Sequence, residues 1–396
     1  MKNTKFKDSK AVIVVHEAIP VGPSHDLRDF FLEHQIQELL FIAHPLIFLK
    51  EFYKKSSRYE EYKTGKLTAK KTAFHYRLPD VLLYGKDFFY SILWCLLQKA
   101  KYDAYIGIDP LNAFAGLVLR KLGKVEKVVY YSIDYFTNRF DNKILNKIYH
   151  LIDKLCVKYA DETWNLSPMM ALARQKYSHM DRKIFNRQLT VPVGVWVHKV
   201  KRKRFSEINR KKIVFIGSFL PLMGIDLILK AIPIIARKIP DIQLDIVGGG
   251  PEDEPLRQFT ANLKMDKNIR FYGWVSEKER LEKILSDAAV GIAPFNTLIL
   301  DDQVRNADPA KLKDYMSWGM PVIVTDAIVN SKQIENARCG IVIQYNVKEL
   351  ADAVIKLLLD EKLLKEYRRN AIRFVEQFDY ERIFNDNLNR LLGVAK

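Results

Sequence analysis

The stretch "DPAKLKDYMSWGMPVIVTD", residues 308–326, contains the signals for a helix, a helix end and a buried strand in direct succession. Asp308 can accept a backbone N–H as the N-cap of a helix, and Pro309 suits the first helical position. Gly319 is typical of a helix end, and residues 321–326 have the composition of a strand buried on both faces. A buried strand that directly follows a helix is one step of an alternating α/β fold.

The same alternation of apolar runs and amphipathic stretches extends over the whole chain and is typical of βα units on parallel sheets. In the first half we expect strands at residues 11–17, 39–45, 104–109, 128–134 and 162–167. In the second half we expect them at residues 212–218, 243–249, 269–274, 290–295, 321–326 and 340–345. Two successive Rossmann-like series predict two α/β domains.

The length of the chain, 396 residues, is more than one ordinary core organises, which agrees with two domains. We place the first domain at residues 1–195, a connector at 196–211 and the second domain at 212–375. Residues 376–396 are expected to form a final helix that crosses back to the first domain.

The net charge of +17 is concentrated in the first half of the chain. Residues 1–212 contain 39 Lys and Arg against 21 Asp and Glu, or +18, whereas residues 213–396 contain 25 against 26, or −1. Such a field attracts anions, whether an acidic lipid surface, a phosphorylated substrate or nucleic acid. The sequence has no helix-turn-helix, zinc-finger, RRM or KH signature, so specific nucleic-acid binding is not expected.

Residues 50–77 combine nine Lys and Arg, three Glu and six aromatic residues without a clear periodicity. One interpretation is a solvated insertion between a strand and a helix. The other is a surface that contacts an anionic membrane or acceptor, because cations with interleaved aromatic rings suit a lipid headgroup region. Both interpretations remain open at the level of the sequence.

The compartment is indicated by three features of the sequence. Its three cysteines, Cys95, Cys156 and Cys339, form no CxxC pair, which favours a reducing environment. The longest apolar stretches are about half of a spanning helix, and the first residues do not resemble a signal peptide. We therefore expect a cytoplasmic protein, soluble or peripheral at the inner face of the plasma membrane.

Within the opening stretch, Lys311 and Asp314 lie three positions apart on one face of the expected helix. The first-turn amides carry partial positive charge and Lys311 adds a full one, which favours a bound phosphate. The Asp314 carboxylate accepts hydrogen bonds, and a ribose diol offers two donors. A nucleoside diphosphate presents both groups; the alternative is a capped surface helix without a ligand.

Other glycine-rich turns accompany this stretch. Gly217 lies near the end of the expected strand 212–218 and Gly224 opens the helix that follows, so the backbone there can approach a ligand closely. The run "IVGGGPEDEPLRQ", residues 246–258, lacks the G-x-G-x-x-G spacing of a dinucleotide site, which disfavours NAD. A turn at Gly273 and Trp274 ends the next strand.

Taken in order, four stretches of the second half and a closing "FDYERIF" helix (378–384) resemble the group 1 glycosyltransferases (glycosyltransferase family 4). The four stretches are "VFIGSFLPLMGIDLILKAI" (214–232), "DIVGGGPE" (245–252), "FYGWVSEKERLEKILSDAAVGIAPF" (271–295) and the opening stretch. The resemblance implies an α/β protein with the GT-B fold, in which two Rossmann-like domains face one another across a cleft. It also implies a nucleotide-sugar on the C-terminal domain, an acceptor on the N-terminal domain, retention of anomeric configuration, and no metal or other cofactor.

Carried over by position, the resemblance implies that Lys311 contacts the diphosphate and Asp314 the ribose, with Asp in place of the usual Glu. The turn at residues 273–275 would border the base, and Asp308, Gly217 and Gly224 would belong to the same substrate site. Two cations that the family usually places on the diphosphate are replaced here by Ser218 and Met223.

A diphosphate that loses two cations needs compensation from another one. Arg305, just upstream of the opening stretch, is the best remaining candidate, and we expect it to share the diphosphate with Lys311. The alternative for Arg305 is an exposed loop charge. The adjacent Asp301 and Asp302 are more typical of a solvated loop than of a metal pair.

In the first domain the candidate catalytic residues are Asp134 and His25. Asp134 ends the expected strand 128–134, where sites of α/β proteins gather, and it can orient an acceptor or sugar hydroxyl or cap the next turn. The residue before it is Ile133, where the family usually has His. His25 follows the first strand and can reach the cleft, or its neighbourhood can form a helix N-cap.

These observations predict a glycosyltransferase that moves a sugar from a nucleotide-sugar to a cell-envelope, polysaccharide or lipid-linked glycan acceptor. A sugar-nucleotide epimerase of the same fold and a non-catalytic relative are the alternatives. The basic first half favours the transferase, because an epimerase acting on a soluble sugar nucleotide needs no field directed at a membrane.

Overall fold

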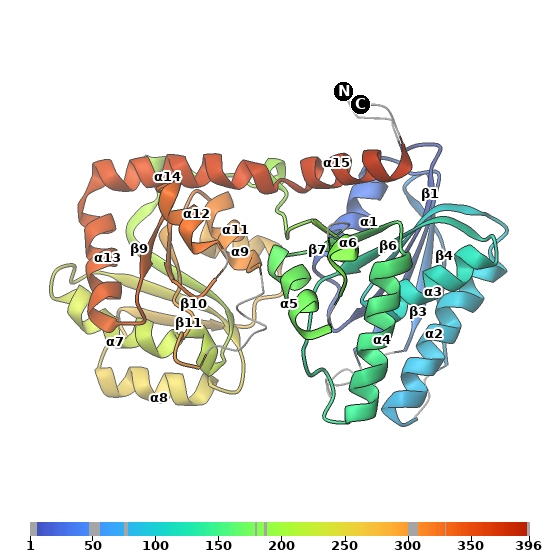
Figure 1. Cartoon of the computed structure of the whole chain (residues 1–396). Coiled ribbons are helices and arrows are strands. Elements are labelled where there is room, and N and C mark those ends of the chain that lie inside the picture. Colours follow the sequence, from blue (N-terminus) through green and yellow to red (C-terminus); the bar gives the residue numbers. More distant parts are fainter. Residues whose placement is uncertain are drawn as a thin grey trace. The chain divides into compact units, whose positions relative to one another are not determined.

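The computed structural model describes residues 6–46, 56–74, 78–178, 180–185, 188–299, 308–328 and 330–393. The chain divides into two compact units (Figure 1). The N-terminal unit comprises Met1–Pro192 together with Tyr380–Lys396, and the C-terminal unit comprises Val193–Asp379.

The sheet of the N-terminal unit has the strand order β4-β3-β2-β1-β5-β6-β7-β8. In the part of the sheet with the order β2-β1-β5-β6-β7-β8, all neighbouring strands pair in parallel. Strand β3 pairs antiparallel with both β2 and β4. The strands are β1 Lys10–Glu17, β2 Glu38–Pro45, β3 Arg58–Lys63, β4 Lys66–Thr72, β5 Tyr102–Ile108, β6 Val125–Ser132, β7 Glu162–Asn165 and β8 Gln188–Thr190. Since β1 lies between β2 and β5, the strand order reverses between β1 and β5, which is where open α/β sheets bind ligands.

The helices of this unit are α1 Pro23–Glu33, α2 Asp80–Leu97, α3 Pro110–Lys121, α4 Lys143–Tyr159, α5 Pro168–Ser178, α6 Arg182–Phe185 and α15 Tyr380–Leu392. The C-terminal helix α15 packs on α1 at the other end of the sequence: the rings of Phe30 and Phe384 are 5.5 Å apart, and His34 Nε2 lies 3.0 Å from Glu381 Oε1. Within the described ranges, no helix is long and apolar enough to cross a bilayer.

Strands β3 and β4 form a hairpin within residues 50–77, a segment whose sequence has no clear periodicity. Its turn places Thr64 and Gly65 at φ 47° and 76°, as a two-residue hairpin turn requires. The hydrophobic alternation is weak because β4 is the outer strand of the sheet, and its exposed Lys66, Lys70 and Lys71 discourage pairing with another chain.

The sheet of the C-terminal unit has the order β11-β10-β9-β12-β13-β14, and all its pairs are parallel. Its strands are β9 Asn209–Ser218, β10 Gln243–Gly249, β11 Ile269–Gly273, β12 Ala288–Ala293, β13 Val322–Thr325 and β14 Gly340–Ile343. This is the doubly wound order of a Rossmann fold, with the reversal between β9 and β12. Every strand expected from the sequence has a counterpart in one of the two sheets; β3, β4 and β8 were not expected.

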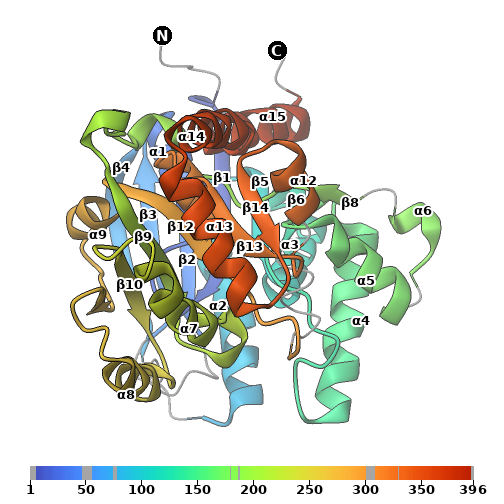
Figure 2. The ribbon, with the colours of Figure 1, turned by 90° about the vertical axis from the view of Figure 1, so that its left-hand side faces the viewer.

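The helices of the C-terminal unit cover both faces of its sheet. They are α7 Ile225–Ala236, α8 Asp253–Leu263, α9 Lys278–Leu285, α11 Ala310–Ser317, α12 Ser331–Asn336, α13 Val347–Leu359 and α14 Glu361–Val375. Along β9 the side chains alternate: Ile213 and Phe215 join one core with α7 and α13, whereas Val214 joins another with α11 and α14. Figure 2 shows α7 and α13 lying together in front of this sheet.

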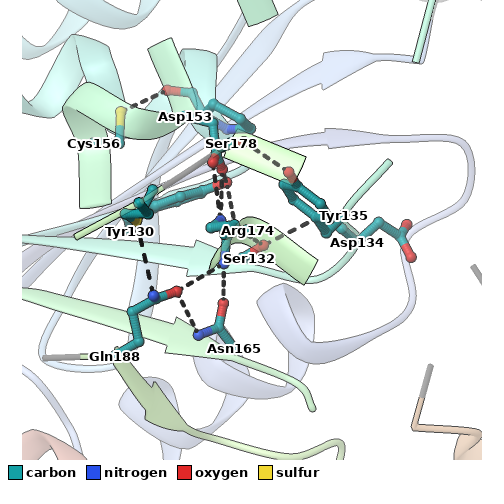
Figure 3. Close-up of polar contacts among 12 residues, drawn as sticks. Tyr130, Ser132, Asp134, Tyr135, Asp153, Cys156, Asn165, Arg174, Ser178 and Gln188 are labelled. Carbon is teal, nitrogen blue, oxygen red and sulfur yellow. Dashed lines mark hydrogen bonds and ion pairs between the residues drawn. The ribbon is translucent and has the colours of Figure 1, made fainter. Parts of the chain in front are cut away.

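A buried ion pair organises the half of the N-terminal sheet that carries Asp134 (Figure 3). Arg174 of α5 is fully buried, and its Nε lies 2.9 Å from Asp153 Oδ2 of α4. The same guanidinium donates to Asn165 of β7 at 2.6 Å and to Ser132 of β6 at 2.7 Å. One side chain therefore joins two helices and two strands, and the Asp134 carboxylate points away from this network.

Replacing Arg174 by Met should lower the free energy of unfolding by about 3–5 kcal/mol, because Asp153 is left as an uncompensated buried charge. The double variant Arg174→Met/Asp153→Leu should be less destabilised than the single one, since it removes both charges. The matched control is Arg390→Met, which breaks an exposed pair with Glu162 and should cost less than about 1 kcal/mol. Urea unfolding measures all three; equal effects of Arg174→Met and Arg390→Met would contradict the assignment.

Candidate functional site

The carboxyl ends of β9 and β12 meet the start of α11 at the reversal point of the C-terminal sheet. Gly217 lies at the end of β9, and Pro294 follows β12 directly. The segment after β9 returns to the segment after β12, where the Asn296 N–H donates to the Leu222 carbonyl at 2.9 Å. Lys311, in the first turn of α11, reaches the same place.

The Lys311 ammonium is enclosed by apolar groups. Its Nζ lies 4.8 Å from the centre of the Phe215 ring and 5.2 Å from that of Phe295. The sulfur of Met223, 3.4 Å away, is its one hydrogen-bond acceptor among the described residues, and a thioether is a weak one. The two ring faces attract the cation but do not replace a carboxylate.

Burial lowers the pKa of the Lys311 ammonium to about 8, and among the described residues no charge opposes that shift. In the described part of the chain, no carboxylate forms an ion pair with Lys311. A buried cation without an acid is costly unless a ligand supplies the counter-charge. The arrangement therefore favours the binding of an anion at this point.

Gly217 makes room for this ammonium. A Cβ at Gly217 would lie 2.7 Å from Lys311 Nζ, and its φ of 144° is one that residues with a side chain rarely adopt. The structure thus brings together two of the residues that the sequence assigned to one site.

Tyr315 is a residue of this site that the sequence reasoning missed. Its hydroxyl accepts a hydrogen bond from the Ile216 N–H at 2.7 Å, which ties α11 to β9 next to Gly217. Burial raises the pKa of Tyr315 well above the usual range. In the sequence Tyr315 is indistinguishable from an ordinary core aromatic, so only its contact identifies this role.

Asp308 is not the N-cap that the sequence predicted. The N-cap position of α11 is Pro309, and no side chain caps this helix. The Asp308 carboxylate is buried, pairs with the Lys313 ammonium, and accepts hydrogen bonds from the Val193 N–H at 3.1 Å and from Asn330 at 2.9 Å. The buried Lys313, five positions on, draws the carboxylate into the protein instead of toward the helix amides.

Gly224 is explained by packing of the chain on itself. It has a φ of 68°, and a Cβ there would lie 1.9 Å from the Pro294 carbonyl oxygen. The close approach that we expected for a ligand is made by the backbone after β12. This glycine therefore shapes the turn from β9 into α7.

The remaining predicted residues of the C-terminal unit lie at strand ends or in α11. Ser218 is exposed at the end of β9, and Asp314 is half-buried one turn beyond Lys311. Gly273 ends β11 with a φ of 68°, and Trp274 after it is 64% exposed. Arg305, Asp301 and Asp302 lie outside the described residues. Elsewhere in the described chain, His, Cys, Asp and Glu form no group of three suited to a metal ion.

In the N-terminal unit, His25 is buried instead of open to a ligand. Its Nε2 lies 3.0 Å from Glu17 Oε2, and Glu17 also pairs with Arg58 at 2.6 Å. Burial opposes ionisation of Glu17, but His25 and Arg58 together hold the pKa of this carboxyl below its usual range. His25 therefore belongs to a structural cluster, and the N-cap of α1 is Gly22. Asp134 is half-buried after β6, and its function stays a prediction.

Comparison with known proteins gives a consistent result. A model of the family "Glycosyl transferases group 1" matches residues 198–374. The GDP-mannose-dependent alpha-(1-6)-phosphatidylinositol monomannoside mannosyltransferase of Mycobacterium tuberculosis is 29% identical over 160 residues, which cover 40% of this chain and 41% of that protein. The chain spans half or less of the length of the curated relatives that it matches first.

Solved structures match over nearly the whole chain. Sucrose-phosphate synthase from Thermosynechococcus elongatus has a TM-score of 0.69 at 14% identity and covers 98% of this chain and 100% of its own. Anabaena HepE in complex with UDP-glucose has a TM-score of 0.68 at 13% identity, and the match covers 97% of this chain and 100% of HepE. The fold is therefore GT-B, as expected, and the relatives do not favour the epimerase alternative.

Two lysines of α11, the half-buried Lys311 and the buried Lys313, should respond to substitution with changes in stability of opposite sign. Lys311→Met should stabilise the ligand-free protein, by at most about 3 kcal/mol for a pKa lowered from 10.5 to about 8. Lys313→Met should destabilise it by about 3 kcal/mol or more, because Asp308 remains buried without its partner. Urea unfolding at pH 7 measures both changes. A Lys311→Met variant less stable than the wild type would contradict the unpaired-cation assignment.

The gain in stability of the ligand-free protein from Lys311→Met should depend on pH. Between about pH 8 and pH 10.5 the unfolded wild type holds the Lys311 proton and the folded protein has released it, so wild-type stability rises with pH. The difference between the two proteins should be largest below pH 8 and shrink toward pH 10.5. A difference that stays constant up to pH 10.5 would argue against titration of Lys311 in this range.

Proposed function

We propose that this chain, whose residues 198–374 match the model of the group 1 glycosyl transferases, transfers a sugar from a nucleotide-sugar to an acceptor glycan. The observation that carries the proposal is the buried Lys311 ammonium, which has no carboxylate partner among the described residues. The diphosphate of a nucleotide-sugar supplies the missing negative charge. The acceptor is a cell-envelope, polysaccharide or lipid-linked glycan.

The geometry supports a donor site at the start of α11. The first-turn amides of this helix and the Lys311 ammonium favour the diphosphate, and Asp314, one turn beyond, accepts hydrogen bonds from the ribose. When the bond between sugar and phosphate breaks, negative charge grows on the departing nucleoside diphosphate. A cation already in place stabilises that charge without reorganisation, which is where the rate enhancement arises.

Two features of the donor site rest on the sequence alone. We propose that Arg305 shares the diphosphate with Lys311, since Ser218 and Met223 stand where the family usually has cations. We also propose that the turn at Gly273 and Trp274 borders the base. Transfer is proposed to retain the anomeric configuration and to proceed without a metal or another cofactor.

The acceptor side of the proposal rests on charge and on the relatives. The excess of +18 in residues 1–212 suits an anionic surface or acceptor. The mycobacterial relative is named for a phosphatidylinositol monomannoside acceptor. Peripheral membrane contact through residues 50–77 is part of the proposal, and the exposed Lys66, Lys70 and Lys71 of the β3–β4 hairpin support it.

Nucleotide binding tests the donor site. We expect UDP, GDP or ADP, or their sugars, to raise the wild-type melting temperature, as any ligand of the native state does. Lys311→Met should lose that shift and the sugar transfer while remaining folded, and Arg305→Met should reduce both. The matched control is Lys348→Met, a change on the solvent-exposed first turn of α13. A full nucleotide shift in Lys311→Met would overturn the site.

Donor affinity should also depend on pH. Only the protonated ammonium of Lys311 attracts phosphate, so affinity for the nucleoside diphosphate should fall above about pH 8, by up to about tenfold per pH unit. Lys311→Arg keeps its charge at these pH values and should show no such fall. Calorimetric titration from pH 7 to pH 10 measures both profiles, and parallel profiles would contradict the role of Lys311.

A further inference from the structure

The N-terminal unit contains a pocket at the reversal point of its own sheet. The pocket has a volume of about 570 Å³, within the range of small-molecule sites. His16 from the end of β1 and Asp109 from the end of β5 lie at its polar end, and α2, α4 and the segment after β6 supply its walls. The sequence reasoning identified neither His16 nor Asp109 as functional, although His16 lies near the end of β1 and Asp109 directly follows β5.

The polar end of the pocket carries a cation, Arg139. Its guanidinium is buried over the rings of Phe136 and Tyr149, at 5.2 and 5.5 Å from their centres. Among the described residues its ion-pair contact is Asp109 Oδ2, which at 4.0 Å is too far for a direct hydrogen bond. Burial works to lower the pKa of Arg139, but nearby Asp109 and other groups keep it raised. The guanidinium therefore stays charged and only loosely paired.

Backbone strain marks the same end of the pocket. Asp109 has φ 74° and ψ 158°, a combination that is almost restricted to glycine. Such strain is concentrated at ligand sites, where the surrounding structure holds it in place. The neighbouring His16 contacts the buried Asp87, with His16 Nε2 3.4 Å from Asp87 Oδ2. Together with Arg139, Asp109 and His16 form a rigid polar end that suits a charged head with hydroxyl groups.

The walls of the pocket are apolar and continue into exposed apolar side chains. On α4, Leu145, Ile148 and Ile152 line the pocket, and Ile144 and Leu151 on the same helix are 70% and 58% exposed. On α2, Val81 lines the pocket and is itself 52% exposed. An apolar ligand that fills the pocket can therefore continue along both helices.

Lysines lie beside this apolar strip on α4. The exposed apolar residues at 144, 148 and 151 recur with helical spacing. Exposed Lys143 and Lys147 each precede one of them by one position, and exposed Lys154 lies three positions after Leu151. A helix with one apolar strip flanked by lysines is typical of binding at an anionic lipid surface. The charge pattern therefore indicates a lipid as the occupant.

We propose that this pocket binds an anionic lipid, with its hydrocarbon chain along α2 and α4 and its phosphate on Arg139. The Asp109 carboxylate then accepts a hydrogen bond from a hydroxyl of the lipid head, and the His16 ring, held by Asn112 and Asp87, lines the pocket beside it. That this lipid is the acceptor of the transferred sugar rests on the function proposed above. The pocket thereby assigns an acceptor class, a phosphate-bearing lipid, and places the membrane-facing surface of this unit at α2 and α4.

Dodecyl phosphate below its micelle concentration tests the pocket by calorimetry. The wild type should bind it at least tenfold more tightly than butyl phosphate, which lacks the chain, or dodecyl maltoside, which lacks the phosphate. Arg139→Met should weaken dodecyl phosphate binding about tenfold and leave dodecyl maltoside unchanged. Ile148→Asn, at a side chain 46% exposed and therefore tolerant of substitution, should weaken both long-chain probes.

The control is Leu359→Asn, at an exposed leucine (61%) of the C-terminal unit, and this variant should bind all probes like the wild type. Nucleotide melting shifts on the same samples separate the two proposals, because the Arg139 and Ile148 variants should keep them. Saturable dodecyl phosphate binding without any nucleotide shift would retain the lipid pocket and refute the transferase. Wild-type dodecyl phosphate binding that is absent, or unchanged in Arg139→Met and Ile148→Asn, would overturn the pocket.

Discussion

An ammonium enclosed by two phenyl rings and a thioether is the constraint around which the C-terminal unit is arranged. Keeping Lys311 there requires a glycine at 217, because any side chain would collide with Nζ. It also requires that α11 be fixed to β9, which the Tyr315 hydroxyl does through the Ile216 N–H. The unit carries an electrostatic cost in the free state that the proposed diphosphate would remove, so ligand affinity and ligand-free stability would be opposed at this residue.

Within each unit, two cations differ in whether a carboxylate lies close to them. Arg174 and Lys313 have short-range carboxylate partners and serve the architecture. Among the described residues, Lys311 and Arg139 have no carboxylate within hydrogen-bond distance, and aromatic rings flank both cations. In a chain with so many cations, this lack of a close partner distinguishes a binding residue from a structural one more sharply than residue type or position does.

The sequence predicted the fold well because parallel sheets leave a strong signal. Strands buried on both faces are continuous apolar runs, and their order with the intervening helices is visible in the chain. The grouping of Lys311 with Gly217 followed from the same order. Asp308 was misassigned because an Asp-Pro pair fits a helix cap, and its partner Lys313 is recognised only once both are seen to be buried. The pocket at Arg139 and Asp109 went unnoticed because loop position and a positive φ leave no pattern in the sequence.

The path of the chain between the units bears on how the protein is made. The C-terminal unit is inserted into the N-terminal one, since the chain enters it at Val193 and leaves at Asp379. These two crossings are bridged, with the Val195 N–H donating to the Phe378 carbonyl at 2.9 Å. Helix α15, which covers Phe30 of α1, is therefore synthesised only after the whole C-terminal unit. The C-terminal unit can finish folding while the apolar face of α1 is still uncovered.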